Sequence, residues 1–159
     1  MVQFNVRDYR REDFHILWQI DQSCFPPGIS YSQFELKTYI GRQRSFTLVA
    51  ESGESGPGAL LGFVIGEISR RMGHIITIDV RSEARRHRLG SALLKAAEGR
   101  LRVEKCSDVR LETAVDNLSA LAFYKRHGYS VMDTIPRYYS NGVDALLLDK
   151  NLLSPVSSS

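Results

Sequence analysis

Apolar and polar residues recur along the chain with periods that predict an ordered series of strands and helices. Alternation predicts a strand over 2–9, and helical spacing predicts helices over 13–24 and, capped by Ser30 or Ser32, to about residue 40. Apolar runs predict strands over 46–50, 60–69 and 74–80, the first two forming an antiparallel hairpin across the glycine-rich segment 52–58. The remaining expected elements are a helix from Leu89 to about residue 105, a strand over 109–115, a helix that Asp116 or Asn117 caps and Gly128 ends, and strands over 129–135 and 143–150.

This order, β-α-α-β-β-β-α-β-α-β-β, predicts an α+β fold in which helices pack on a mixed sheet. A chain of 159 residues can bury one sizeable core, whereas two domains would be cramped. We therefore expect one domain over 1–152, without internal repeats, and a disordered tail over 153–159.

The composition is that of an ordinary soluble protein with a mild net charge of +3. No apolar run approaches the ~20 residues that a membrane helix needs, and the first residues lack a signal-peptide pattern. Cys24 and Cys106 match no metal-ligand spacing, which favours reduced, structural thiols and no metal. These features predict a cytoplasmic protein without a membrane partner.

Segment 81–88 holds four arginines and a histidine, and it joins the strand over 74–80 to the helix that begins at Leu89. Free backbone N–H groups, the positive helix end and the arginines would converge on one point, which is the geometry of a phosphate or pyrophosphate site. A nucleic-acid patch and a solvated loop are the alternatives. We expect no nucleic-acid partner, because basic residues and aromatics are not spread over several elements.

Two motifs carry a family resemblance. The run Arg85-x-x-Arg88-x-Gly90-Ser91-Ala92 resembles the acetyl-CoA signature of the GNAT acyltransferases, Gln/Arg-x-x-Gly-x-Gly/Ala. The segment from Asn117 through Tyr124 to Tyr129 resembles a helix of the same family. The resemblance extends over nearly the whole chain, from residue 2 to about 152. It implies a GNAT fold, with a central mixed sheet of six to seven strands, splayed parallel strands 4 and 5, four flanking helices, and acetyl-CoA as cosubstrate.

Arg88 departs from the family pattern, which usually has glycine at this position. Glycine permits a close backbone approach or a positive φ. At a negative φ an arginine would cost little, and its side chain could face solvent or the 3′-phosphate of coenzyme A. We expect cofactor binding to survive this exchange.

The resemblance also assigns the cofactor site. A backbone N–H near Ile78 to Val80 would polarise the thioester, the arginine-rich loop would wrap the pyrophosphate, and Asn117 would contact the pantetheine arm. Asn117 and Tyr124 are seven residues apart, on one helix face and roughly 10 Å from each other. The expected cofactor-binding residues are Ile78, Asp79, Val80, Arg85, Arg86, His87, Arg88, Leu89, Gly90, Ser91, Asn117 and Tyr124.

Acetyl transfer to an amine needs a group that accepts the amine proton and a group that protonates the leaving thiolate. Tyr124 is expected to be the acid, with a core tyrosine as the alternative. Glu112 is expected to be the base, directly or through water, and His74 is the competing base. The alternative for Glu112 is a surface carboxylate paired with an arginine. Neither cysteine has a motif that supports an acyl-enzyme, so we expect direct transfer in a ternary complex.

Phe25-Pro26, Glu112, Tyr124 and the pair Tyr138-Tyr139 resemble the N-terminal protein acetyltransferases, RimI-like enzymes in particular. The resemblance implies a protein or peptide N-terminus as acceptor, for example that of a ribosomal protein. An α-amine with a pKa near 8 costs about 1.4 kcal/mol to deprotonate at pH 7, against roughly 4.6 kcal/mol for lysine. The expected slot is lined by Phe25, Tyr31, Tyr138 and Tyr139, and it needs a backbone bend at the adjacent tyrosines.

Other functions stay open at this point. A small-molecule amine or a lysine side chain could be the acceptor. A function of another class is a non-catalytic, regulatory module that binds acyl-CoA. We expect a monomer or weak dimer.

Overall fold

We describe the protein from a computed structural model, which describes residues 3–53, 59–85 and 88–153. In this part of the chain the elements follow the predicted order, with boundaries that differ by a few residues. The strands are β1 (Phe4–Asp8), β2 (Ser45–Ser52), β3 (Leu60–Ser69), β4 (Met72–Val80), β5 (Asp108–Ala114), β6 (Ser130–Ile135) and β7 (Ala145–Asn151). The helices are α1 (Phe14–Cys24), α2 (Gln33–Gly41), α3 (Leu89–Val103) and α4 (Leu118–Arg126), with short 3₁₀ helices η1 (Arg11–Asp13) and η3 (Ser82–Ala84).

The strands form one mixed sheet in the order β1-β2-β3-β4-β5-β7-β6. The pair β4–β5 is parallel, and the other neighbouring strands run antiparallel, including the predicted β2–β3 hairpin. The mixed α+β fold expected from the sequence is confirmed.

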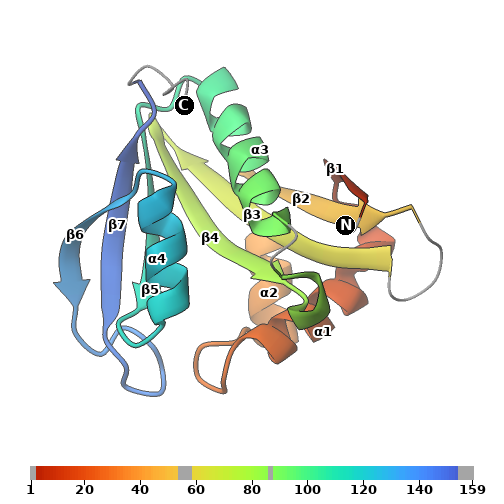
Figure 1. The fold of residues 1–159 in the computed structure, drawn as a ribbon, viewed down its shortest axis with the longest axis horizontal. Helices are drawn as coiled ribbons and strands as arrows, with labels where there is room; N and C mark the ends of the chain where they lie inside the picture. Colours follow the sequence, from red (N-terminus) through yellow and green to blue (C-terminus); the bar gives the residue numbers. More distant parts are fainter. Residues whose placement is uncertain (1–2, 54–58, 86–87, 154–159) are drawn as a thin grey trace.

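Strands β4 and β5 pair only at one end. Their register covers Met72↔Asp108, Gly73↔Val109 and His74↔Arg110, and beyond His74 the two strands diverge. Figure 1 shows the sheet opening at this point into a β1–β4 part and a β5–β7–β6 part. The predicted splay of two parallel strands is therefore present, and it leaves the second half of β4 without a neighbour on one side.

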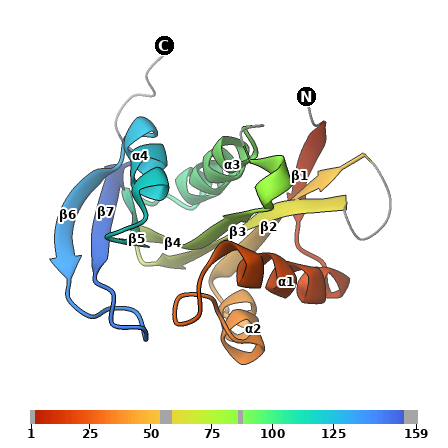
Figure 2. The same ribbon diagram turned by 60° about the horizontal axis from the view of Figure 1, so that its bottom comes forward.

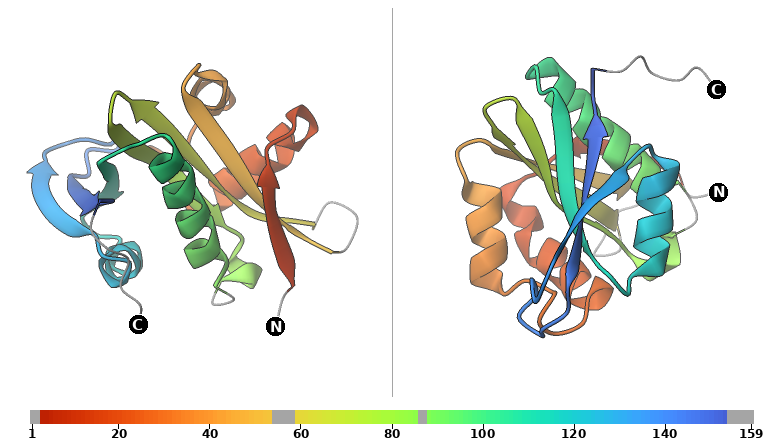
Figure 3. Two further views of the ribbon diagram at one scale, coloured as in Figure 1. Left: turned by 90° about the horizontal axis from the view of Figure 1, so that it is seen from above. Right: turned by 90° about the vertical axis from the view of Figure 1, so that its left-hand side faces the viewer.

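Helices cover both faces of the sheet. Helices α3 and α4 lie on one face, and α1 and α2 lie on the other, as Figures 2 and 3 show from two directions. Each face has its own cluster of buried apolar residues.

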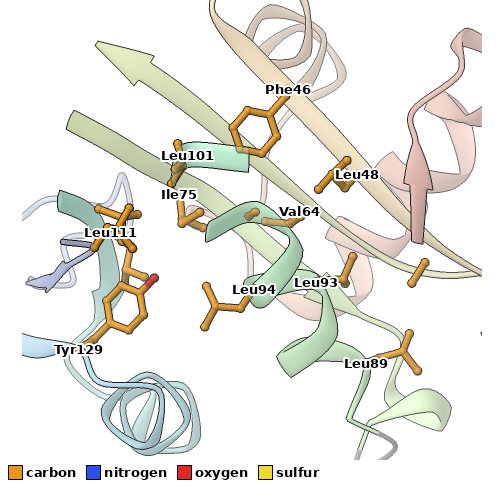
Figure 4. Packing of buried hydrophobic residues seen from close by; sticks show 14 of the residues in the cluster. Phe46, Leu48, Val64, Ile75, Leu89, Leu93, Leu94, Leu101, Leu111 and Tyr129 are labelled. Carbon is orange, nitrogen blue, oxygen red and sulfur yellow. The ribbon is translucent and has the colours of Figure 1, made fainter. Parts of the chain in front are cut away.

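The predicted apolar stripe of α3 forms the centre of the larger cluster. Leu89, Leu93, Ala97 and Leu101 are each at most 1% exposed, and they pack against β2, β3 and β4. Figure 4 shows the three leucines of this stripe. Leu89 is the first residue of the helix, so burial of this stripe fixes where α3 begins. The positive end of the helix is thereby held at the mouth of the β4–β5 opening.

Local capping settles two alternatives that the sequence left open. Ser32, and not Ser30, caps α2, with a reciprocal capping box to Glu35. Asn117, and not Asp116, caps α4 by accepting a hydrogen bond from the Ala120 N–H. Gly128 follows α4 with a φ of +92°, a backbone conformation that favours glycine after a helix end.

Some expectations concern residues outside the described ranges. The residues concerned are most of the glycine-rich segment 52–58, the tail over 154–159, and Arg86 and His87, which were expected to bind the cofactor. None of the helices in the described ranges is both long and apolar enough to cross a membrane.

Candidate active site

A cavity of about 1010 Å³ lies where β4 and β5 diverge. Its walls come from the end of α1 and the loop after it, from β4 and β5, from the start of α3, from α4 and from the β6–β7 loop. The opening in the sheet thus brings together segments that are distant in sequence. Of the sequence-predicted residues, the cavity lining includes Phe25, Tyr31, Ile78, Val80, Arg85, Arg88, Leu89, Gly90, Ser91, Glu112, Asn117, Tyr124 and Tyr139.

The second half of β4 directs backbone groups toward this cavity. The Arg81 N–H donates to Leu61 O of β3 at 2.9 Å. Successive strand residues direct their N–H groups to opposite sides, so those of Ile78 and Val80 point away from β3 and toward the opening. The Val80 carbonyl already accepts from Arg85 Nε at 3.1 Å on that side. The proposed donors for a thioester oxygen are therefore correctly oriented.

The start of α3 forms an anion-binding corner of the cavity. The first intrahelical bond runs from the Ala92 N–H to Arg88 O, which leaves the N–H groups of Leu89, Gly90 and Ser91 for other acceptors. Arg85 and Arg88, which lie just before α3 in the sequence, line the cavity, and so does Arg126 of α4. Free amides, helix dipole and cations together suit a pyrophosphate.

Arg88 has a φ of +63° and a ψ of +15°, the left-handed region. The negative φ at which arginine would cost little is therefore not present. For a residue with a Cβ, the left-handed conformation costs roughly 1–2 kcal/mol. The geometry explains why glycine suits this position, and it places backbone strain directly beside the anion-binding corner.

Asn117 caps α4 and also lines the cavity. Its Oδ1 accepts from the Ala120 N–H and from Ser119 Oγ, both at 3.2 Å. The cap thus fixes the carbonyl side of the amide, while the residue lines the cavity. Its contact with a pantetheine arm stays a prediction, and the side chain has its NH₂ group available for that contact.

Tyr124 lies on α4 between the rings of Phe123 and Tyr129, both packed against it edge-on with centroids 5.2 and 5.7 Å away. Burial raises the pKa of its phenol above the ordinary value, and the Asp79 charge acts in the same direction. The phenol is therefore protonated at neutral pH. A protonated phenol at the cavity wall is suited to donate a proton.

The two candidate bases form one hydrogen-bonded unit. His74 Nε2 lies 2.7 Å from Glu112 Oε1, and the Tyr138 hydroxyl donates to the same oxygen at 3.3 Å. Glu112 is therefore not a surface carboxylate paired with an arginine. Glu112 lines the cavity and His74 does not, so the carboxylate is the member of the unit that faces a substrate.

Three of the four aromatic residues expected to form the acceptor slot line the cavity. They are Phe25, Tyr31 and Tyr139, whereas Tyr138 does not line the cavity and instead donates a hydrogen bond to the cavity-lining Glu112. The backbone bends before the pair, where Arg137 has a φ of +49°, and the two rings meet edge-on at 4.9 Å. Only Tyr139 of the pair lines the cavity, so this bend does not place both tyrosines there.

Asp79 was expected among the cofactor-binding residues, but its side chain is 1% exposed and does not line the cavity. It hydrogen-bonds Thr77 Oγ1 at 2.5 Å and contacts Asp21 of α1. Alternation along β4 explains this difference. Ile78 and Val80 pack toward α3, which puts Asp79 on the opposite face, against α1.

Some cavity residues escaped the sequence analysis. Arg126 of α4 is not among the predicted site residues, and nothing in a single sequence shows that it faces a cavity. Cys24 was read as structural. The structure places its Sγ 3.4 Å from Val80 O, on the cavity wall. Both cysteines are free thiols, and the described residues contain no cluster of three or more His, Cys, Asp or Glu side chains that could hold a metal.

The sequence model of the acetyltransferase (GNAT) family matches residues 14–129. This match covers well over half of the chain. The protein belongs to the GNAT family of acetyltransferases.

Similar proteins include several N-acetyltransferases. An uncharacterized N-acetyltransferase of Methanocaldococcus jannaschii is 37% identical over 94 residues, which cover 58% of this chain and 60% of that protein. The human N-alpha-acetyltransferase 30 is 34% identical over 119 residues, 74% of this chain and 33% of the human protein. An N-alpha-acetyltransferase of Sulfurisphaera tokodaii is 26% identical over 161 residues, 92% of each chain. The chain thus spans 60% of the first of these relatives and 33% of the second, less than two thirds of either.

Among solved structures, Ard1 from Thermoplasma volcanium is similar with a TM-score of 0.86 and 26% identity, over 96% of this chain and 100% of that chain. The GNAT fold implied by the sequence motifs is thereby confirmed.

Proposed function

We propose that this protein transfers the acetyl group of acetyl-CoA to the N-terminal α-amine of a protein or peptide. The observation that carries the proposal is the cavity between β4 and β5. It joins an anion-binding corner, a strand with outward-facing N–H groups, a protonated tyrosine and a carboxylate in one space. Relatives named as N-alpha-acetyltransferases support the choice of acceptor.

The geometry supports a definite placement of acetyl-CoA. Its pyrophosphate would bind the N–H groups at the start of α3, with Arg85, Arg88 and Arg126 nearby. The pantetheine arm would pass between β4 and β5 toward Asn117. Its thioester oxygen would accept from the N–H of Ile78 or Val80, which would stabilise the developing oxyanion.

In direct transfer, Glu112 would accept the proton of the amine, directly or through water, as the amine attacks the thioester carbon. The C–S bond then breaks, and Tyr124 would give its proton to the departing thiolate. His74 and Tyr138 hold Glu112 in place through hydrogen bonds to Oε1. No acyl-enzyme is needed, and the thiol of Cys24 has its pKa raised by burial, which makes it a poor nucleophile.

The acceptor would enter beside Phe25, Tyr31 and Tyr139. Two loops that flank this entrance are joined by the Ser140 hydroxyl, which donates to Gly28 O at 2.9 Å. A single carboxylate is sufficient for an α-amine, which is partly neutral at pH 7, and less adequate for lysine. The acceptor we propose is the N-terminus of a cytoplasmic protein, such as a ribosomal protein. We propose that the enzyme itself is cytoplasmic and a monomer or weak dimer.

The test is an acetylation screen with acetyl-CoA over peptides that differ in their first residues. Matched controls are the same peptides with a blocked N-terminus and an internal lysine, together with free lysine and polyamines. We expect acetylation of free N-termini and loss of product when the N-terminus is blocked. Acetylation of lysine or polyamines alone would replace the proposed acceptor by a side-chain or small-molecule amine.

A further inference from the structure

A pair of buried carboxyl groups joins α1 to the cofactor strand. Asp21 on α1 is 0% exposed and Asp79 on β4 is 1% exposed. Asp21 Oδ2 accepts from the Tyr31 N–H at 2.7 Å, and Asp79 Oδ1 accepts from Thr77 Oγ1 at 2.5 Å. The other two oxygens, Asp21 Oδ1 and Asp79 Oδ2, have no hydrogen-bond partner among the described residues. The two carboxyl groups lie close enough for each to affect the pKa of the other.

This arrangement requires a proton. Two ionised carboxylates in contact and out of water would repel each other, and each would leave a desolvated oxygen unpaired. One proton held between them would give a partner to both unpaired oxygens and would leave a single charge to be stabilised.

Other groups face the pair from each neighbouring element. Glu35 of α2 raises the pKa of Asp21, and the Tyr31 N–H lowers it. Arg85, after η3, lowers the pKa of Asp79 but is exposed and directs its Nε to Val80 O. Cys24 and Tyr124 are neutral at pH 7, since burial raises the pKa of each. No neighbouring cation therefore makes an ion pair with either carboxyl in the described part of the chain.

We propose that Asp21 and Asp79 share one proton, and that this bond fixes the position, relative to β4, of the loop between α1 and α2, which carries the cavity-lining Tyr31. The proposal rests on the function proposed above. Both residues act as positioning residues, because neither lines the cavity.

The contacts of Tyr31 show what the pair would position. Its N–H donates to Asp21, its carbonyl accepts from Trp18 Nε1 at 3.2 Å and Gln22 Nε2 at 2.6 Å, and its hydroxyl reaches Ile76 O at 3.5 Å. This cavity-lining tyrosine therefore takes its place from α1. Asp79 lies between Ile78 and Val80, whose N–H groups face the cavity. The shared proton thus connects Tyr31, on the side where the acceptor would enter, to the N–H groups of Ile78 and Val80 that would bind the thioester oxygen.

The test uses Asp79→Asn, in which the amide N–H replaces the shared proton and its carbonyl can still accept from Thr77. In the wild type, the KM for an acceptor peptide should rise at alkaline pH, by up to about tenfold per pH unit once the pair loses its proton, because the positioned form becomes scarce. In Asp79→Asn the KM should stay flat over the same range, with kcat near that of the wild type at pH 7. Asp13→Asn is the matched control, since Asp13 is a buried carboxylate bound to Arg7 and should leave the pH profile of KM unchanged.

A second measurement needs no turnover. In carboxyl ¹³C NMR of the full chain, one of the two aspartates should be protonated at pH 7, and the amide signal of Tyr31 should titrate with it in the wild type but not in Asp79→Asn. The proposal would be overturned if both carboxyl groups were ionised at pH 7, or if the Tyr31 amide signal did not titrate with the pair. An alkaline rise of KM that persists in Asp79→Asn would also overturn it. If the NMR result holds while no peptide is acetylated, the proposed acceptor fails and the shared proton stands.

Discussion

Replacing Tyr124 by phenylalanine isolates the proposed acid. The ring is held by edge-on contacts with Phe123 and Tyr129, which phenylalanine keeps. No hydrogen bond of the Tyr124 hydroxyl is present among the described residues, so the substitution breaks none that the structure shows. The unfolding free energy should therefore change by less than about 1 kcal/mol.

The effect on chemistry should be much larger. General acid catalysis typically contributes about 10²–10⁴-fold, which corresponds to roughly 2.7–5.4 kcal/mol of transition-state stabilisation. Because burial raises the pKa of the phenol, the wild-type tyrosine stays protonated through neutral pH and can act there as an acid. We expect Tyr124→Phe to lower kcat by about this factor and to leave the Kd for acetyl-CoA nearly unchanged.

The assay follows release of the coenzyme A thiol with an acceptor peptide in saturating excess, and calorimetry gives the Kd for acetyl-CoA. The matched control is Phe123→Leu, which alters packing on the same helix without removing a hydroxyl. A kcat within about threefold of the wild type would remove Tyr124 as the acid. Equal losses in both variants would mean that packing of α4, and not proton donation, sets the rate.

Three further predictions concern the base, the strained loop and the buried pair. Glu112→Gln should lower kcat/KM by about a hundredfold or more, and His74→Ala should lower it less; a larger loss in His74→Ala would reverse the assignment. Arg88→Gly should raise the unfolding free energy of the free protein by up to about 1 kcal/mol by relieving the left-handed φ, while weakening acetyl-CoA binding in calorimetry. Because the pKa of Asp79 is raised, the folded protein keeps a proton that the unfolded chain loses above about pH 4. Its unfolding free energy should therefore fall with rising pH, by up to about 1.4 kcal/mol per pH unit until the folded pKa is passed, and denaturant titrations should show a shallower fall in Asp79→Asn.

The element order and much of the cavity wall could be predicted because they depend on local patterns. The α3 stripe of Leu89, Leu93, Ala97 and Leu101 has helical spacing, and burial follows from that spacing. The Asn117 cap and Gly128 are likewise local signals. Where one element determines the role of a residue, the sequence is sufficient.

Features that depend on two distant segments were not predictable in the same way. The pairing of His74 with Glu112 requires the β4–β5 register, in which His74 lies opposite Arg110. The contact of Asp79 with Asp21 requires the packing of α1 against β4. The left-handed φ of Arg88 is set by the connection between η3 and α3. The glycine that the family usually has at this position indicated that a positive φ could occur there.

The short pairing between β4 and β5 has a consequence for how the protein responds to its ligand. The sheet consists of two parts that share ladder contacts only around residues 72–74 and 108–110, so the free protein lacks the interstrand bonds that would lock the two parts together. A cofactor arm inserted between the strands would take the place of a missing strand. Binding at this one cleft should then slow amide hydrogen exchange on both sides of it, at Ile78 and Val80 in β4 and at Glu112 and Ala114 in β5, whose N–H groups point away from β7. It should also make the two parts unfold as one cooperative unit.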